Sequence, residues 1–302
     1  MAAPTQTPPD LQQRSFEEPR RRALREAAIR YALLAATSTG IVVLGILLYR
    51  VFSDGLTYLD FGFLVSLPSR IDPDSAGVSP GLTGTLSLML IVALGSFPIG
   101  IGAALYLEEF APKNRVTALI ETNISNLAGV PSVVYGLLGA GLFVGILDIG
   151  RSLLAGGVTL ILLILPVIIV TSREAIKAVP NELREGGLGL GATRWQTTQK
   201  LVLPQALPGM ITGAILGLSR AIGEAAPILV VGATSARFRN NSPLDLFDQF
   251  SALPINIYNY TFDPDPVFTQ LAASAIIVLL GALLLMNGIA IYFRNRASRG
   301  NA

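Results

Sequence analysis

Six stretches of the chain are long and apolar enough to cross the hydrocarbon core of a lipid bilayer as helices. Each contains about 20 mostly apolar residues, the length that a helix needs to span a bilayer. Charged residues and prolines collect between these stretches. The pattern predicts an all-α, polytopic membrane protein whose six transmembrane helices cover residues 31–52, 82–107, 124–147, 152–171, 211–231 and 268–292.

The same pattern predicts one transmembrane domain over residues 31–298, flanked by a cytoplasmic tail at 1–30 and a short tail at 299–302. The first dozen residues contain too few apolar side chains to pack, so we expect them to be disordered. From Arg20 the tail becomes basic and helical, which favours contact with anionic membrane lipid. The first apolar stretch is too long for a signal peptide and lacks an obvious cleavage site, so we expect a retained helix.

The distribution of charge predicts the orientation in the membrane. If the N-terminus is cytoplasmic, inner segments hold sixteen of the 22 basic residues. Outer segments hold five, counting Arg50 at the outer end of the first span, and Arg220 lies inside a predicted span. Lysine and arginine are enriched in cytoplasmic loops of membrane proteins. We therefore expect a multi-pass protein of the cell membrane with both termini in the cytoplasm. The long outer segments 53–81 and 234–267 carry several aspartates, which suit either a docking surface or solvated loops.

The composition excludes most catalytic chemistry. Apolar residues make up 51% of the chain and charged residues only 14%, against about 25% charged residues in an ordinary soluble domain. The chain contains no histidine and no cysteine. This removes Ser-His-Asp and Cys-His nucleophiles, histidine or cysteine zinc sites and disulfides. We expect no catalytic residue and no metal site, and the net charge of +2 is too small to argue for nucleic acid.

The predicted cytoplasmic segment 172–208 is too long for a minimal turn and too polar to cross the membrane. Its sequence predicts a short helix that begins near Pro180 and stops at a run of glycines. A second helix is predicted from Thr193 to Leu203 and should end at Pro204. Two short helices joined by a glycine turn would form a projection that a partner protein could grip. The alternative is a solvated linker.

This segment resembles the EAA loop of the permease subunits of ABC importers. The resemblance rests on the spacing of Glu185-Gly186-Gly187, Gly191 and Leu201-Val202-Leu203-Pro204. Here two glycines replace the alanines that give the loop its name, which lowers helix propensity by about 1 kcal/mol per residue. In that family the loop forms a coupling helix that sits in a cleft of a cytoplasmic ATPase subunit. The resemblance thus implies that docking uses Glu182, Glu185, Gly186, Gly187, Leu188, Gly189, Leu190 and Gly191.

No Gly-x-x-x-x-Gly-Lys-Ser/Thr phosphate-binding loop occurs in the chain. We therefore expect the chain to bind no cofactor, and ATP and Mg²⁺ to be held by a separate ATPase subunit. This absence also argues against an ABC exporter with fused ATPase domains.

Two charged residues fall within the fifth predicted span. Arg220 lies about 18 Å along the helix from Pro208, near the centre of the bilayer, where a charge is costly, so we expect it to face the interior of the bundle and to have a partner. Glu224 is four residues later on the same helix face, so the two side chains can pair. One interpretation is an ion pair that fixes packing. The other is an anion path, because a guanidinium presents donors that match phosphate oxygens while the carboxylate keeps the site weak enough to release its cargo.

The run Ser219 to Pro227 resembles the R-x-x-GE-x-AP stretch in the A-type permease subunits of Pst phosphate-uptake systems. Residues 127–136 and 253–258 agree with the same family, and the similarity covers about 85–302. The resemblance implies the type I ABC importer permease fold and a permease for inorganic phosphate. It also implies a heterodimer with a C-type permease, two copies of a cytoplasmic ATPase and an extracytoplasmic phosphate-binding protein. The acidic outer loops then pose no difficulty, since the binding protein would deliver the anion.

Two other functions remain open at this stage. An ABC permease for another oxyanion, such as molybdate or sulfate, would use the same loop and the same charge pair. An ion-driven secondary transporter or a membrane-embedded enzyme is a function of a different class. Such proteins would show repeated halves with charges in several spans, or a cluster of active-site residues, and neither is visible in the sequence.

Overall fold

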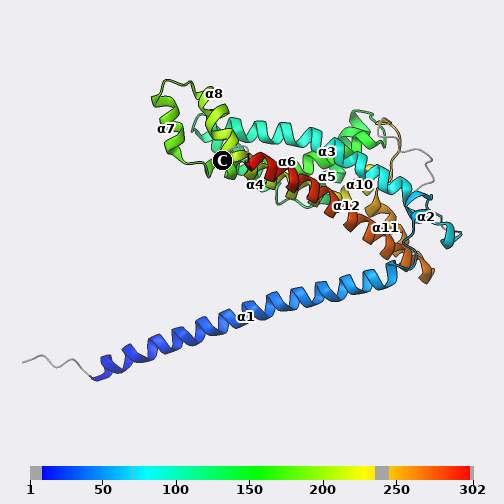
Figure 1. Ribbon diagram of the computed structural model, residues 1–302, viewed down its shortest axis with the longest axis horizontal. Coiled ribbons are helices and arrows are strands. Elements are labelled where there is room, and N and C mark those ends of the chain that lie inside the picture. The colour runs from blue at the N-terminus through cyan, green and yellow to red at the C-terminus, as the bar shows by residue number, and fades with distance from the viewer. Residues whose placement is uncertain (1–8, 70, 235–244, 300–302) are drawn as a thin grey trace, which may run out of the picture. The chain divides into compact units, whose positions relative to one another are not determined.

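The computed structural model describes residues 9–69, 71–234 and 245–299 (Figure 1). All regular elements within these ranges are helices, which confirms the predicted all-α class. Three sets of expectations lie outside the described residues: those for the first eight residues of the N-terminal tail, those for residues 300–302 of the C-terminal tail, and the outer placement of Arg70 and of segment 235–244.

The helix α1 spans Pro9–Gly55, and residues up to Ser53 form a compact unit of their own. Within α1, residues Ala23–Gly55 are apolar and long enough to cross a membrane, as the sequence predicted for 31–52. The expectation of disorder was wrong for residues 9–12, which are helical. Proline is well accepted in the first turn of a helix, and leucine and glutamine, which follow Pro9 and Asp10, are good helix formers.

The second unit, from Asp54 onward, contains the other elements. Three of them, η2, η3 and η4, are π-helical stretches that continue or precede an α-helix. The elements of this unit are α2 (Phe61–Val65), η1 (Pro73–Ser75), α3 (Ser79–Leu105), η2 (Tyr106–Phe110), α4 (Arg115–Leu127), α5 (Ser132–Gly139), η3 (Ala140–Ile146), α6 (Leu153–Lys177), α7 (Asn181–Gly189), α8 (Arg194–Thr197), η4 (Thr198–Val202), α9 (Leu203–Ile222), α10 (Ala226–Val231), α11 (Leu253–Thr261) and α12 (Pro266–Arg299).

Helices α3, α6 and α9 form the centre of this unit, and α6 packs against both of the others. Glycines allow the close approach: a Cβ atom at Gly100 of α3 would lie 2.6 Å from the Cγ2 atom of Ile168 on α6. Ile168 is fully buried in the main apolar cluster. Small residues at helix contacts are typical of proteins in lipid, where close packing replaces the hydrophobic drive between helices.

Five described helices can cross a membrane, and a sixth crossing results if one bent pair counts as a single span. That pair is α4 with α5 and η3, and its two parts meet at 102°. The span predicted over 124–147 is therefore not one continuous helix but a pair of helices. The helix breaks between Leu127 and Ser132 because Pro131 has no N–H for the carbonyl of Leu127 and disfavours helical geometry at Val130.

Two further helix boundaries differ from the prediction. The expected continuous helix over 211–231 is interrupted at residues 223–225, since the ring of Pro227 would clash with the carbonyl of Gly223 in an unbroken helix. Conversely, the second loop helix does not end at Pro204 but continues from Arg194 to Ile222. The π-helical stretch η4 ends directly before Leu203 and widens the turn that meets the proline ring.

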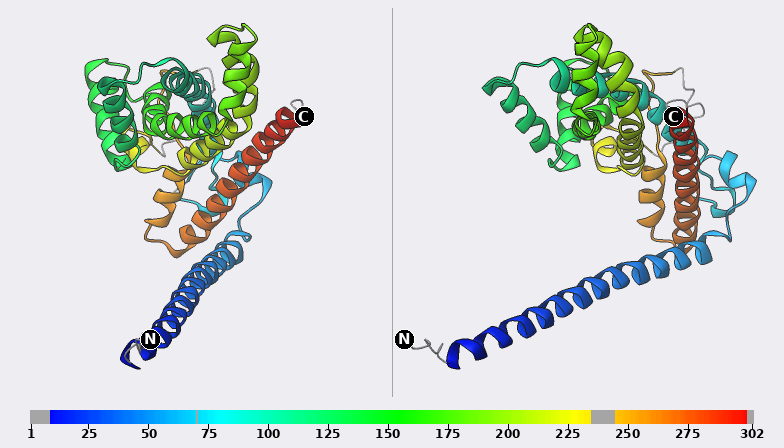
Figure 2. Two further views of the ribbon diagram at one scale, coloured as in Figure 1. Left: turned by 90° about the vertical axis from the view of Figure 1, so that its left-hand side faces the viewer. Right: turned by 60° about the vertical axis from the view of Figure 1, so that its left-hand side comes forward.

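Helices α7 and α8 belong to segment 172–208, which we call the coupling loop after its resemblance. They lie at one end of the second unit, and α2 and α11 lie at the opposite end (Figures 1 and 2). Helix α12 runs between these ends and finishes on the side of α7. At the α11 end, the phenol of Tyr260 donates a 2.8 Å hydrogen bond to the carbonyl of Gly77. Burial raises the pKa of Tyr260 well above its ordinary value, so the phenol remains a donor.

We predict that Thr85→Val will lower the free energy of unfolding of the protein by about 1 to 3 kcal/mol. The buried Thr85 hydroxyl oxygen accepts a 2.9 Å hydrogen bond from the backbone N–H of Leu253, and valine would leave this donor without a partner. Thr261→Val is the matched control, because the Thr261 hydroxyl is exposed and bonds only within its own helix. The midpoint of thermal unfolding in detergent measures both; equal midpoints for the two variants would contradict the prediction.

Candidate functional site

The expected ion pair between Arg220 and Glu224 is present, with 3.2 Å between Arg220 Nε and a carboxylate oxygen of Glu224. Arg220 lies in the last turn of α9, and Glu224 lies in the interruption before α10. The expectation that Arg220 faces the interior of the bundle does not hold within this chain alone, because its side chain is 42% exposed, against 18% for Glu224. The charge pair therefore sits at a broken helix and opens outward from this subunit.

The bent pair α4 and α5 packs beside this interruption. A Cβ atom on Gly136 of α5 would lie 2.7 Å from the Cα atom of Pro227 on α10, so the two short helices touch through backbone atoms. The Tyr135 hydroxyl donates a 2.9 Å hydrogen bond to the carbonyl of Leu127, the group that Pro131 leaves without its helical donor. The fold thus brings together the two sequence stretches 127–136 and 219–227.

Arg220 retains capacity to bind an anion. Its Nε–H donates to Glu224, and this is the one hydrogen bond that its guanidinium makes among the described residues. A guanidinium carries five N–H donors in a planar fork that fits the oxygens of phosphate or a carboxylate. Interrupted helices commonly line substrate sites in transporters, because irregular backbone at membrane depth is tolerated only where it faces protein or a water-filled path.

The predicted coupling helix forms as α7, Asn181–Gly189, in spite of the glycines within it. It ends in a Schellman motif: the N–H of Ala192 bonds to the carbonyl of Gly187, and the N–H of Gly191 bonds to that of Leu188. Gly191 has a φ of +82°, a left-handed conformation that glycine adopts without the steric cost of a Cβ atom. This glycine is therefore the stop signal, whereas the earlier ones lie inside the helix.

Most of the residues expected to dock on a partner are exposed. Leu190 at the tip is 92% exposed, and Leu188 is 46% exposed. Glu182, Glu185, Gly186 and Gly189 are exposed as well, whereas Gly187 is buried. Gly187 faces the following helix, where an added Cβ atom would lie 2.9 Å from both Thr197 Oγ1 and Leu201 Cδ1. The loop thus presents one face to solvent and one to its own second helix.

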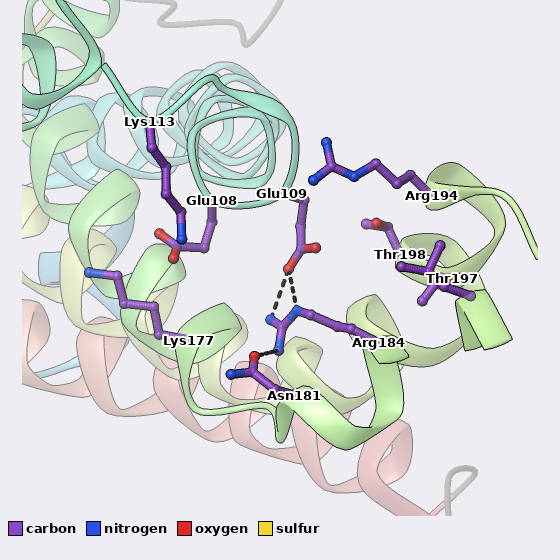
Figure 3. Close-up of a pocket in the computed structure, with 10 residues that line it drawn as sticks. Glu108, Glu109, Lys113, Lys177, Asn181, Arg184, Arg194, Thr197 and Thr198 are labelled. Carbon is purple, nitrogen blue, oxygen red and sulfur yellow. Dashed lines mark hydrogen bonds and ion pairs between the residues drawn. The ribbon is translucent and has the colours of Figure 1, made fainter. Parts of the chain in front are cut away.

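A set of ion pairs that joins α7, η2, α6 and α4 was not predicted from the sequence. Arg184 of α7 points away from the exposed face and binds Glu109 of η2 with a 2.8 Å N to O distance (Figure 3). Arg173 near the end of α6 binds Glu108 of η2 at 3.4 Å and Glu121 of α4 at 2.8 Å. The sequence offered one signal for these pairs: Glu108, Glu109 and Arg173 carry charge directly after the cytoplasmic ends of two predicted spans. The pairs join residues that lie 52 to 75 positions apart in the chain, so the sequence did not reveal them.

An open polar pocket of about 400 Å³ lies between η2 and the coupling loop. Lys113, Lys177 and Arg194 line it with Glu108 and Glu109 (Figure 3). Among the described residues, no group of three or more acidic residues is placed to hold a metal ion. The chemistry of this region is that of a charged protein surface rather than of an enclosed ligand site.

We predict that Gly186→Ala will slow amide hydrogen exchange in α7 about fivefold, because alanine has about 1 kcal/mol higher helix propensity and the new methyl group meets no atom within 4 Å. Gly187→Ala should not slow exchange, since its methyl group must displace Thr197 and Leu201. Exchange rates of residues 183–190 by mass spectrometry give the comparison. Equal slowing in both variants would show that the packing at Gly187 is unimportant.

Comparison with known proteins places the chain in one family. Residues 96–299 match the family of binding-protein-dependent transport system inner membrane components. A probable ABC transporter permease of Bacillus subtilis, YqgI, is 33% identical over 82% of this chain and 88% of its own length. The phosphate transport system permease protein PstA 1 of Mycobacterium tuberculosis is 32% identical, covering 74% of this chain and 73% of its own.

Solved structures agree with this assignment at the level of the fold. A bacterial ABC transporter involved in import of the acidic polysaccharide alginate has a TM-score of 0.60 at 16% identity, covering 91% of this chain and 99% of its own. The MetNI methionine ABC transporter in an inward-facing conformation gives 0.57 at 19% identity, covering 74% of this chain and 94% of its own. With its membrane-spanning helices and its EAA-type loop, the chain belongs to the inner membrane permease components of ABC importers and is a non-catalytic, multi-pass membrane subunit.

Proposed function

We propose that this chain forms half of the translocation path for inorganic phosphate in an ATP-driven importer. The observation that supports it most directly is the Arg220–Glu224 pair at the α9–α10 interruption, which leaves guanidinium donors open on the outward face. Several relatives at 27 to 34% identity carry the name phosphate transport system permease protein PstA. Phosphate is therefore favoured over molybdate or sulfate as the cargo.

The exposed side of the charge pair implies a second subunit. A guanidinium at membrane depth that is exposed on the surface of its own subunit would be costly against lipid, so another protein should cover it. We infer a heterodimer with a C-type permease, in which Arg220 lies at the interface and phosphate passes between the two subunits. An extracytoplasmic phosphate-binding protein would dock at the α2 and α11 end and deliver the anion.

The coupling loop supports a second partner. The exposed face of α7 with Leu188 and Leu190 suits a cleft of a cytoplasmic ATPase subunit, of which the importer would contain two copies. ATP and Mg²⁺ would be bound there, and this chain would hold no cofactor. The α7 end, where α12 finishes, would then face the cytoplasm, with both termini on that side of the inner membrane.

Alternating access follows from these contacts. Closure of the ATPase dimer would move α7, and the attached helices would tilt to open the path to one side of the membrane or the other. Arg220 would bind the phosphate oxygens while the path is occupied, and Glu224 would take the guanidinium back afterwards. Because Glu224 also repels anions, the site would hold its cargo weakly enough to release it.

We predict that Arg220→Gln will abolish phosphate uptake by cells expressing the complete set of subunits, because glutamine supplies neither the charge nor the fork of donors. Assembly should survive, as shown by co-purification of the ATPase. Arg296→Gln, an identical change at an exposed position near the end of α12, is the control and should leave uptake unchanged. Undiminished uptake in Arg220→Gln would make the arginine a structural residue and remove it from the path.

We also predict that a crosslinker attached at Leu188→Cys will reach the ATPase subunit. The chain contains no cysteine, so the introduced thiol is the single attachment point on it. Ile71→Cys, at an 85% exposed position in the segment between α2 and α3, serves as the control and should give no such product. Labelling at Leu188 that reaches only lipid or solvent would contradict the docking role of α7.

A further inference from the structure

Two consecutive glutamates at the inner end of α3 each bind an arginine from a different segment. Glu109 binds Arg184 of the coupling helix α7, and Glu108 binds Arg173 of α6. Both glutamates lie in η2, the π-helical stretch that ends α3. One short element therefore receives a charged contact from the coupling helix and from the central membrane helix.

The guanidinium of Arg184 is fully used. Its Nε and Nη2 atoms donate to one oxygen of Glu109 at 3.0 and 2.8 Å, and Nη2 also donates to the carbonyl of Ile176 at 2.9 Å. Its Nη1 atom donates to the carbonyl of Val179 at 2.7 Å and to the side-chain oxygen of Asn181 at 3.2 Å. All five N–H donors thus have an acceptor, and the end of α6, the start of α7 and η2 are tied to one side chain.

Arg173 extends the connection to α4. Its side chain is only 9% exposed, and its Nη2 atom lies 2.8 Å from a carboxylate oxygen of Glu121 on α4 and 3.4 Å from one of Glu108. A guanidinium with so little contact with water depends on both carboxylates to offset its charge. Helix α4 is therefore held to the ends of α3 and α6 by a partly buried ion pair rather than by apolar packing alone.

From α4 the contacts continue to the proposed anion path. The end of α4 accepts the hydrogen bond from Tyr135, which lies in α5. Helix α5 in turn touches Pro227 of α10 through Gly136, next to the interruption that carries Glu224. Each step joins packed or hydrogen-bonded groups of described residues, so a displacement of α7 has a continuous physical route to the charge pair.

We propose that Glu109, Arg184, Glu108, Arg173 and Glu121 form a mechanical link that makes the coupling helix, the inner ends of α3 and α6, and α4 move as one body. Glu109 and Glu121 are then positioning residues: they touch neither phosphate nor nucleotide but carry the ATPase's movement to the bent pair α4 and α5. The proposal rests on the proposed function as an ATP-driven importer and is independent of which oxyanion is carried.

A nearby ion pair, between Lys177 and Glu174, has the same chemistry but does not connect separate helices. Lys177 and Glu174 are 3.1 Å apart on α6, but both side chains are well exposed and belong to one helix. Exposed pairs of this kind contribute little to stability and connect no separate elements. Glu174→Gln is therefore the matched control for Glu109→Gln and Glu121→Gln.

The test uses the complete transporter in liposomes, with phosphate uptake and ATP hydrolysis measured side by side. In Glu109→Gln and Glu121→Gln we expect uptake to fall tenfold or more while hydrolysis stays within twofold of the unchanged protein, so the two become uncoupled. Glu174→Gln should change neither. If both rates are unchanged in the two link variants, or if both fall together because the ATPase no longer co-purifies, the link is refuted.

A second measurement does not depend on the cargo. Nitroxide labels on Thr122→Cys in α4 and Glu185→Cys in α7 report the distance between these helices by pulsed electron resonance. With the link intact, the distance should stay the same when ATP and vanadate trap the ATPase in its closed state. In the Glu109→Gln background the distance should change. A distance that already changes in the intact protein would overturn the link. Absence of phosphate uptake by the unchanged protein would instead overturn the proposed cargo and leave this result standing.

Discussion

The structure is organised by one physical constraint: a segment within a lipid bilayer cannot leave a charge or a backbone polar group without a partner. A long uninterrupted helix such as α12 satisfies it through its own hydrogen bonds. Two predicted spans are interrupted within the described residues, at 128–131 and 223–225, and these interruptions lie beside each other through the contact between α5 and α10. Irregular backbone is thus concentrated where protein covers it or where an anion is proposed to pass.

Arg184, Arg173 and Arg220 differ in how their donors are used, and this suits them to different roles. Arg184 has an acceptor for each of its five N–H groups, and Arg173 is held by two carboxylates, so both are suited to transmit movement. Among the described residues Arg220 makes one hydrogen bond, to Glu224, and its side chain is partly exposed. A guanidinium with N–H donors to spare can exchange partners, which a transport site requires. A guanidinium whose donors all have acceptors instead moves together with the groups that it binds.

The sequence predicted the features that depend on local patterns. Apolar length identified the spans, and spacing along one helix face predicted the pairing of Arg220 with Glu224. It did not predict the 102° bend after Leu127 or the continuation of the helix through Pro204, because proline marks a possible break and the neighbouring turn decides whether it occurs. The pairs of Arg184 with Glu109 and Arg173 with Glu121 bring together distant segments, so only the folded chain could reveal them.

Phosphate movement through this chain should depend on a separate ATPase, and a reconstituted transporter measures this dependence. The two permeases, the ATPase and the binding protein are placed in liposomes, and uptake of radiolabelled phosphate is followed with and without ATP and in competition with sulfate or molybdate. We expect uptake that requires both ATP and the ATPase and that excess sulfate or molybdate does not suppress. Uptake by the permeases without the ATPase, or accumulation of another oxyanion in place of phosphate, would contradict it.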